Sequence, residues 1–213
     1  MAISKVNFNS LNVTPTASKT LKFNSSNNGL EAGDVGGALV LISEQTASSS
    51  STISFTSGID STYKEYVFKF IDVHAATDNV HFQVNFRDGG SSYDATKTTT
   101  VFRAYQSEGD VEAGLDYDTN ADLAQSTGVQ FLTRNQGNDN DHSCSGTLHL
   151  FDPSSTTFVK HFIASLSMSN YANYQLIHHV AGYCNVTAAI DGVQFSFSSG
   201  NIDSGTIKMY GVT

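Results

Sequence analysis

The sequence has no tryptophan, only two prolines and two cysteines, and a charged fraction of 15%, against about 25% in typical soluble proteins. No segment keeps an apolar 3.6-residue period over three turns, which argues against a helical bundle. No apolar run is long enough for a signal peptide or a bilayer span, so we expect synthesis in a cytoplasm and no membrane insertion. Cys144 and Cys184 show no zinc-site spacing. Two buried free thiols are expected, with a disulfide as the alternative.

The net charge is −9, with a sequence pI near 5.0. Such a surface repels phosphate backbones, so nucleic acid is not an expected partner. The charge is uneven, because residues 1–30 contain Lys5, Lys19 and Lys22 and no acidic side chain. This local charge of +3 leaves −12 on the remainder of the chain.

Residues 1–37 differ from the rest of the chain, since they are poor in apolar side chains and end in a glycine cluster. Such a segment buries little by itself, so we interpret it as an N-terminal docking arm, extended or ordered only against a partner. The alternative is an ordinary first strand and loop of the main domain, residues 38–213. The arm residues expected to bind a partner are Val6, Phe8, Leu11, Val13, Lys19, Leu21, Lys22 and Phe23.

From residue 38 onward the hydrophobic pattern has a period of two, as in antiparallel strands with one buried face. In "NVHFQVNF", residues 80, 82, 84 and 86 are apolar, whereas His81, Gln83 and Asn85 are expected on the opposite face. "TGVQFLT" is expected to bury Val129 and Phe131 in the same way. The ten expected strands lie within residues 51–57, 65–73, 79–86, 98–105, 127–133, 145–151, 158–168, 175–183, 192–199 and 206–212.

Strands at this spacing, separated by turn signals and not by helices, predict two packed antiparallel sheets. The predicted fold is therefore all-β, a two-sheet sandwich of the jelly-roll or lectin-like kind with an extended N-terminal arm. The segment 65–73 is apolar on both faces and is expected in the middle of a sheet. The final segment, "TIKMYGV", is expected to complete a sheet.

Several long blocks carry a resemblance to a known group of proteins: "ISFTSGIDSTYKEYVFKFIDVHAATDNVHFQ", "SSYDATKTTTVFRAY", "DLAQSTG", "FDPSSTTFVKHF" and "SGNIDSGTIKMYGV". Matched in order over most of residues 38–213, they resemble virion structural proteins of tailed phages of marine and freshwater bacteria, including cyanophages. The resemblance implies a non-enzymatic tail-fibre or virion-surface subunit made in the host bacterial cytoplasm, or a capsid decoration protein. It also implies other virion proteins as partners and a closed homo-oligomer, most often a trimer. It implies no catalytic residue.

The acidic segment "EGDVEAGLDYDTNADLAQ" is the best candidate for an ion-binding loop. Its side chains Asp116, Asp118, Asn120 and Asp122 fall at positions 1, 3, 5 and 7 of a calcium-loop pattern. Position 6 is alanine and position 12 is threonine, where the pattern requires glycine and glutamate. We therefore expect a solvated loop, with a structural Ca²⁺ ion as the alternative and no other cofactor.

A third hypothesis is a carbohydrate-binding adhesin that recognises a host surface glycan. The loop 138–142, "NDNDH", is either a plain hairpin tip or a sugar-contact loop. The tyrosines expected near strand ends are Tyr93, Tyr117, Tyr171 and Tyr174. His178 and His179 are adjacent on a strand, so one should point into the protein and the other outward. A secreted hydrolase is disfavoured because no Gly-x-Ser-x-Gly motif or distinct carboxylate pair is present.

Overall fold

The computed structural model describes residues 19–24, 26, 28–34 and 38–213. Within these residues the regular structure consists of β-strands, with no helix, which confirms the all-β prediction. No helix in this described part could therefore cross a membrane. The strands are β1 (Lys19–Phe23), β2 (Leu30–Asp34), β3 (Leu39–Thr46), β4 (Ile53–Phe55), β5 (Glu65–Ala75), β6 (Phe82–Arg87), β7 (Lys97–Ser107), β8 (Ala113–Tyr117), β9 (Gln130–Phe131), β10 (Cys144–Phe151), β11 (Lys160–Ser169), β12 (Tyr174–Cys184), β13 (Gly192–Phe197) and β14 (Ile202–Val212).

The chain forms two compact units, Met1–Ala38 and Leu39–Thr213. In the first unit β1 and β2 pair as an antiparallel hairpin, with Phe23 opposite Leu30. The sequence pattern did not predict this hairpin, because neither strand is apolar enough to stand out. Of the residues expected to bind a partner, Val6, Phe8, Leu11 and Val13 lie outside the described part of the chain.

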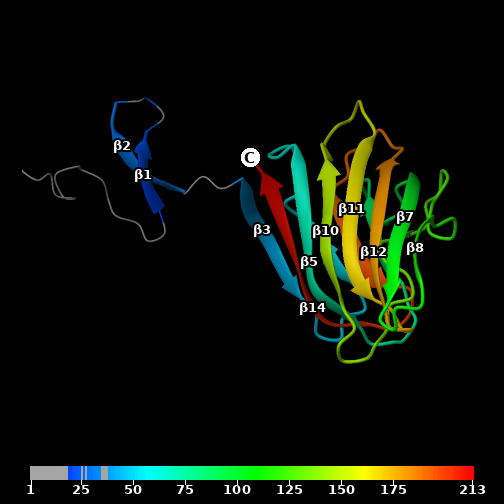
Figure 1. Cartoon of the computed structure of the whole chain (residues 1–213). Helices are drawn as coiled ribbons and strands as arrows, with labels where there is room; N and C mark the ends of the chain where they lie inside the picture. The colour runs from blue at the N-terminus through cyan, green and yellow to red at the C-terminus, as the bar shows by residue number, and fades with distance from the viewer. Residues whose placement is uncertain (1–18, 25, 27, 35–37) are drawn as a thin grey trace, which may run out of the picture. The chain divides into compact units, whose positions relative to one another are not determined.

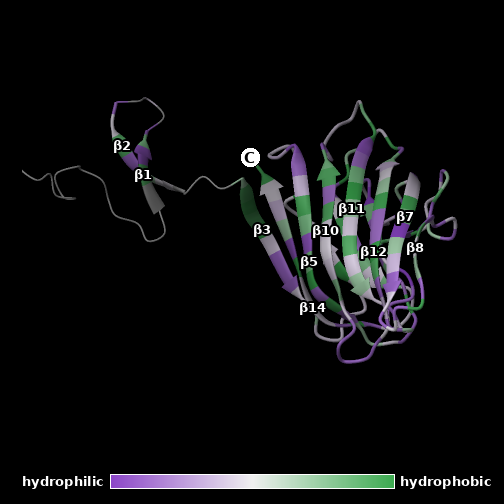
Figure 2. Ribbon diagram, in the orientation of Figure 1, coloured by the Kyte–Doolittle hydropathy of each residue, from purple (hydrophilic) through white to green (hydrophobic). Residues whose placement is uncertain are grey.

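The second unit is built on an eight-stranded antiparallel sheet in the order β3-β14-β5-β10-β11-β12-β7-β8 (Figure 1). The last strand, β14, lies between β3 and β5, so the prediction that the C-terminal segment completes a sheet is confirmed. The strand that is apolar on both faces, β5, lies between β14 and β10, also as predicted. Along these strands hydrophobic and hydrophilic residues alternate (Figure 2), because successive side chains point to opposite faces.

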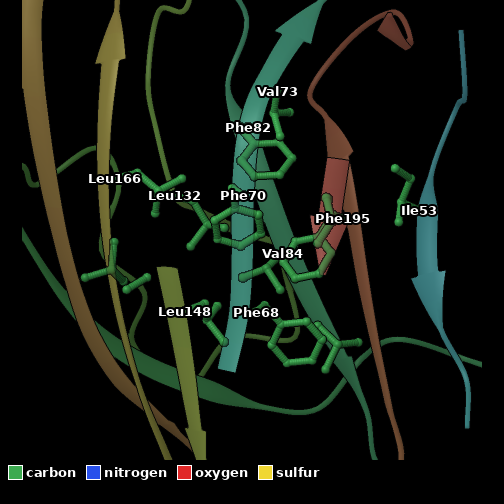
Figure 3. Packing of buried hydrophobic residues seen from close by; sticks show 14 of the residues in the cluster. Ile53, Phe68, Phe70, Val73, Phe82, Val84, Leu132, Leu148, Leu166 and Phe195 are labelled. Atoms are coloured by element: carbon green, nitrogen blue, oxygen red, sulfur yellow. The ribbon is translucent and has the colours of Figure 1, made fainter. Parts of the chain in front are cut away.

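A four-stranded sheet in the order β4-β13-β6-β9 packs face to face on the inner side of the large sheet. Phe195 of the small sheet lies at the centre of this core, with its ring centroid 5.1 Å from that of Phe70 and 5.5 Å from that of Phe68 on β5 (Figure 3). These aromatic side chains are buried and meet edge to face, an arrangement that contributes beyond simple burial. The two-sheet sandwich is therefore confirmed.

The expected register of 127–133 was wrong. Val129 is exposed and Phe131 is only partly buried, whereas Gln130 is completely buried. Gln130 lies opposite the buried Val84, so its side chain points into the protein. There its amide nitrogen, Nε2, donates to the backbone oxygens of Ala121 and Phe131, and its Oε1 accepts from a threonine hydroxyl. Because the amide is fully hydrogen-bonded, the interior tolerates it.

The expected exposure of Asn85 was also wrong. Asn85 is only 8% exposed, although it lies on the face of β6 opposite the core phenylalanines. Lys97 and the backbone oxygen of Thr127 cover it. A period of two cannot predict this burial, because it comes from a neighbouring strand and a long loop and not from the packing of the two sheets.

Candidate binding sites

A polar cavity lies where β5 and β14 depart from regular pairing. Gly205 has a φ of +115°, and Asp72 opposite it has a φ of +49°. A side chain at position 205 would approach the Asp72 backbone oxygen to 2.7 Å, so glycine is required there. The pairing shifts on both sides of Ser204, which turns neighbouring side chains toward the loop 138–143. The cavity of about 360 Å³ is lined by Asp72, His74, Asn140, His142, Ser143, Asp203 and Ser204.

The polar atoms of this cavity are only partly satisfied. His74 Nδ1 lies 3.4 Å from Asp203 Oδ2 without hydrogen-bond alignment, and His74 Nε2 lies 3.1 Å from the Asp139 backbone oxygen. His142 is 4% exposed, and its Nδ1 has no hydrogen-bond partner among the described residues. The described part of the chain holds no group of three or more histidine, cysteine or acidic side chains placed to bind a metal. The chemistry of this lining fits a ligand rich in hydroxyl groups.

The loop 138–142, which the sequence predicts to be either a plain hairpin tip or a sugar-contact loop, borders this cavity. Asn140 and His142 line the cavity, whereas the backbone oxygen of Asp139 faces His74. The loop is therefore packed against two strands, and the partners that it meets there, on β5 and β14, are far away in sequence.

A second, smaller depression of about 190 Å³ lies between β7 and β12, lined by Arg103, Tyr105, Glu112, Asn170, Tyr174 and Leu176. The Tyr174 hydroxyl donates to Glu112 Oε2 at 2.8 Å, and the Arg103 guanidinium lies 5.5 Å from the centre of the Tyr105 ring. Of the tyrosines that the sequence singled out, Tyr174 lines this depression. The others lie elsewhere: Tyr171 is exposed, Tyr93 faces Arg87, and Tyr117 donates its hydroxyl hydrogen to Asp122.

The four residues of the expected calcium loop do not converge. Asp116 accepts from Arg103 Nε at 2.9 Å, and Asp122 accepts from the Tyr117 hydroxyl at 2.7 Å. Asp118 is 3% exposed, and both its carboxylate oxygens accept from Arg134, at 2.7 and 2.8 Å. Asn120 is exposed, with its backbone amide donating to Asp118. The loop therefore uses its carboxylates as separate structural acceptors and not as one ligand set.

Burial of Asp118 would raise the pKa of its carboxyl group, but the hydrogen bonds and charge of Arg134 outweigh burial and hold that pKa below its ordinary value. The ion pair is nearly enclosed, since the Asp118 side chain is 2% exposed and that of Arg134 is 18% exposed. Asp118 is therefore ionised in the folded protein and fixes the loop on the sandwich.

The histidine pair divides as predicted. His179 points outward and its ring stacks on that of Phe102, with centroids 4.8 Å apart. His178 is 1% exposed, and neither ring nitrogen has a hydrogen-bond partner among the described residues. Burial lowers the pKa of His178 to about 4, so the ring is neutral at pH 7.

Two buried lysines were missed by the sequence analysis. Lys97 and Lys160 are both completely buried, and both lie beside Cys184 in the register of the large sheet. Nothing in their sequence context distinguishes them from exposed strand lysines. Cys184 and Cys144 are buried free thiols, as expected, and burial raises the pKa of both.

The outer face of the large sheet is not covered within the second unit. Exposed apolar side chains gather there over β7, β8 and β11, namely Phe102, Leu115, Tyr117 and Ile163. Beside them lies a mainly apolar depression of about 380 Å³ over the small side chain Ala181, bordered by Thr98, Thr100, His161 and Tyr183. Charged side chains of the same face lie farther along the sheet, on β5 and β14, where Lys69 is opposite Lys208.

No protein-family model and no curated protein matches this chain. A crystal structure from Bacteroides ovatus at 2.40 Å resolution, described as a structural genomics protein of unknown function, is similar at 10% sequence identity with a TM-score of 0.19. The similarity covers 64% of this chain and 45% of that chain. At this TM-score it carries no argument about fold or function.

Proposed function

We propose that this chain is a non-enzymatic structural subunit of a phage virion, a tail-fibre or virion-surface accessory protein, in which residues 1–37 attach a β-sandwich body to another virion protein. The observation that carries the proposal is the division of the chain into a small N-terminal unit and a separate sandwich. The resemblance of the sequence blocks to virion proteins supplies the biological setting. A capsid decoration protein has the same two-part design and is the alternative within this class.

The described hairpin of the N-terminal unit supports a docking role. Leu21 is 44% exposed and Phe23 is 70% exposed, while Lys22 lies 3.5 Å from Glu31 on the neighbouring strand. Lys19, at the start of β1, pairs with Asp34 through the backbone. A two-stranded hairpin is at best marginally stable alone in water. A partner that covers the apolar side chains, or adds a strand to the hairpin edge, would stabilise it.

The uncovered face of the large sheet supports self-association of the body, and we expect a closed homo-oligomer such as a trimer. Phe102, Leu115, Tyr117 and Ile163 are each about half exposed or more. Burial of such side chains contributes roughly 25 cal/mol per Å² of apolar area. Several copies on one particle would also make weak single contacts effective through multivalency.

Deleting residues 1–37 is expected to leave a soluble, folded body that no longer incorporates into particles. The substitutions Leu21→Ser and Phe23→Ser together should reduce incorporation in the same direction, because they remove the exposed apolar side chains of the hairpin. The measurement is the amount of each variant in purified particles from cells that lack the wild-type protein.

The matched control is Phe158→Ser, since Phe158 is 71% exposed on the sandwich, almost the same fraction as Phe23. This variant should incorporate normally. The deletion variant, which consists of residues 38–213, should still form the homo-oligomer. Light scattering should therefore give the molar mass of the oligomer and not that of a single chain. A deleted protein that enters particles at the wild-type level would reject the docking role.

The cavity at the loop 138–143 favours a second candidate function, recognition of a host surface glycan. Sugars present many hydroxyl groups, and the lining offers carboxylate and amide oxygens and hydroxyl groups. The site would lie on the body, so this function is compatible with attachment through the N-terminal unit.

Glycan-array binding by the full chain tests this candidate. Asn140→Ala and Asp203→Ala should each lower binding about two- to tenfold, because both side chains are exposed and a hydrogen bond there contributes about 0.5–1.5 kcal/mol. Tyr174→Ala, in the other depression, should leave binding unchanged. Loss of binding in the Tyr174 variant alone, or no glycan bound at all, would contradict the assignment.

A further inference from the structure

Lys97 has an unusual environment for a lysine. Its side chain is completely buried, and Nζ lies 2.5 Å from Asn85 Oδ1 and 2.7 Å from the Ala95 backbone oxygen. No carboxylate lies within ion-pair distance of Nζ among the described residues. Both contacts of the amine are with neutral oxygens, so burial disfavours the charged form and lowers the pKa of Lys97 to about 8. At pH 7 about one tenth of this amine is therefore neutral, and a neutral amine is a nucleophile.

Hydrogen bonds to both polar atoms of its carboxamide hold Asn85 beside Lys97. Its Oδ1 accepts from Lys97 Nζ and also from the backbone N–H of Phe86, at 3.0 Å. Its Nδ2 donates to the Thr127 backbone oxygen at 3.3 Å. The N–H of Phe86 can stabilise negative charge that develops on Oδ1, as an oxyanion donor does. The carboxamide is 8% exposed, so it is also shielded from water.

We propose that Lys97 and Asn85 join spontaneously as an intramolecular isopeptide bond that links β7 of the large sheet to β6 of the small sheet. Neutral Nζ attacks Asn85 Cγ, and the C=O electron pair moves onto Oδ1. The proton released by Nζ passes to Nδ2 as the carbonyl re-forms and the Cγ–Nδ2 bond breaks. The products are a secondary amide and ammonia, so one amine and one carboxamide are consumed. The reaction needs no oxidant, reductant or external group.

Lys160 and Cys184 lie near Lys97, but neither is expected to form such a bond. Lys160 is also completely buried beside Cys184, but its Nζ donates to the backbone oxygen of Val186 at 2.7 Å, and a backbone amide has no ammonia to release. Cys184 is a competing nucleophile, but burial raises the pKa of its thiol to about 12 and keeps it protonated. The pair of Lys97 with a side-chain carboxamide is therefore the reactive one.

The consequence is a covalent connection between the two layers of the sandwich. Asn85 and Lys97 lie on either side of the connection between β6 and β7, which belong to different sheets. An amide bond between them prevents these strands from separating when the protein is pulled or denatured. In the denatured protein, residues 85–97 would form a closed loop.

Mass spectrometry of the denatured full chain tests the proposal. After folding and incubation at about pH 9, where unreacted Lys97 would be neutral, the mass should be about 17 Da below the value calculated from the sequence, the mass of one ammonia. Trypsin should then produce a branched peptide, with residues 70–87 joined through Asn85 to residues 88–103, uncut after Lys97. Arg87 lies between the two linked residues, so the branch is diagnostic.

Asn85→Ala and Lys97→Arg should have the full calculated mass and give separate tryptic peptides. Lys160→Met, the matched buried lysine, should keep the branch. The branched peptide also excludes loss of ammonia by succinimide formation at another asparagine. A wild-type protein with the full calculated mass and separate peptides overturns the proposal without reference to any variant, so failure of a variant to fold does not weaken the test.

Discussion

Removing residues 208–213 is expected to abolish folding of the sandwich. These residues form the second half of β14, which is hydrogen-bonded to β3 on one side and β5 on the other. Met209 is completely buried and lies opposite Phe68, near the centre of the core. Loss of a buried methionine side chain alone costs about 2–5 kcal/mol, and whole domains are stable by only about 5–15 kcal/mol.

The truncation also breaks the ladder that connects β3 to the rest of the sheet. β3 then keeps only the pairs of Thr46 with Thr206 and of Gln45 with Ile207, and residues 66–69 of β5 gain a free edge, which favours aggregation. The expected result is insoluble protein, or soluble protein without a cooperative thermal transition in circular dichroism. Removing Thr213 alone is the matched control, because β14 ends at Val212 and its ladder stays intact. A truncated protein that melts like the intact chain would show that β14 is wrongly placed.

Replacing Asp118 by alanine is expected to lower the free energy of unfolding by about 3–5 kcal/mol. The substitution leaves the Arg134 guanidinium largely buried without its counter-charge, and breaking a buried pair on one side typically costs that much. Arg134 Nε already has no hydrogen-bond partner among the described residues, so the protein offers no obvious replacement. Chemical denaturation at pH 7 measures the change.

The matched control for Asp118→Ala is Asp116→Ala, measured in the same denaturation experiment. It also removes an arginine partner from the same loop, but the Asp116 side chain is 44% exposed and that of Arg103 is 28% exposed. Exposed pairs contribute about 0–1 kcal/mol, so the loss should be small. Equal losses in the two variants would contradict the distinction between the pairs.

The same pair predicts a response to acid. The pKa of Asp118 is lower in the folded protein than its ordinary value of 3.8. Its contribution is therefore complete above pH 3.8 and is lost as the pH falls through the lower, folded pKa. The difference in unfolding free energy between wild type and Asp118→Ala should shrink in that range.

Local alternation was sufficient to predict the strands whose outward face meets water. The segments around Phe55, Phe195 and Met209 follow the period of two, and their apolar residues form the core. The same reasoning failed at Gln130 and Asn85, which are buried by partners elsewhere in the chain. Hydrogen bonds to those partners satisfy the polar groups, and a sequence pattern contains no information about them.

The fold class could be predicted from the order of residues alone, because alternating side chains require a sheet with one buried face and several such sheets must pack together. The tertiary structure, and not the sequence pattern, decides which polar groups contact one another. Asp118 with Arg134, Lys97 with Asn85, and the loop 138–143 with β5 and β14 are brought together by strand order and by bulges. These contacts join residues 12 to more than 60 positions apart, and their chemistry arises from burial, which no residue has before the chain folds.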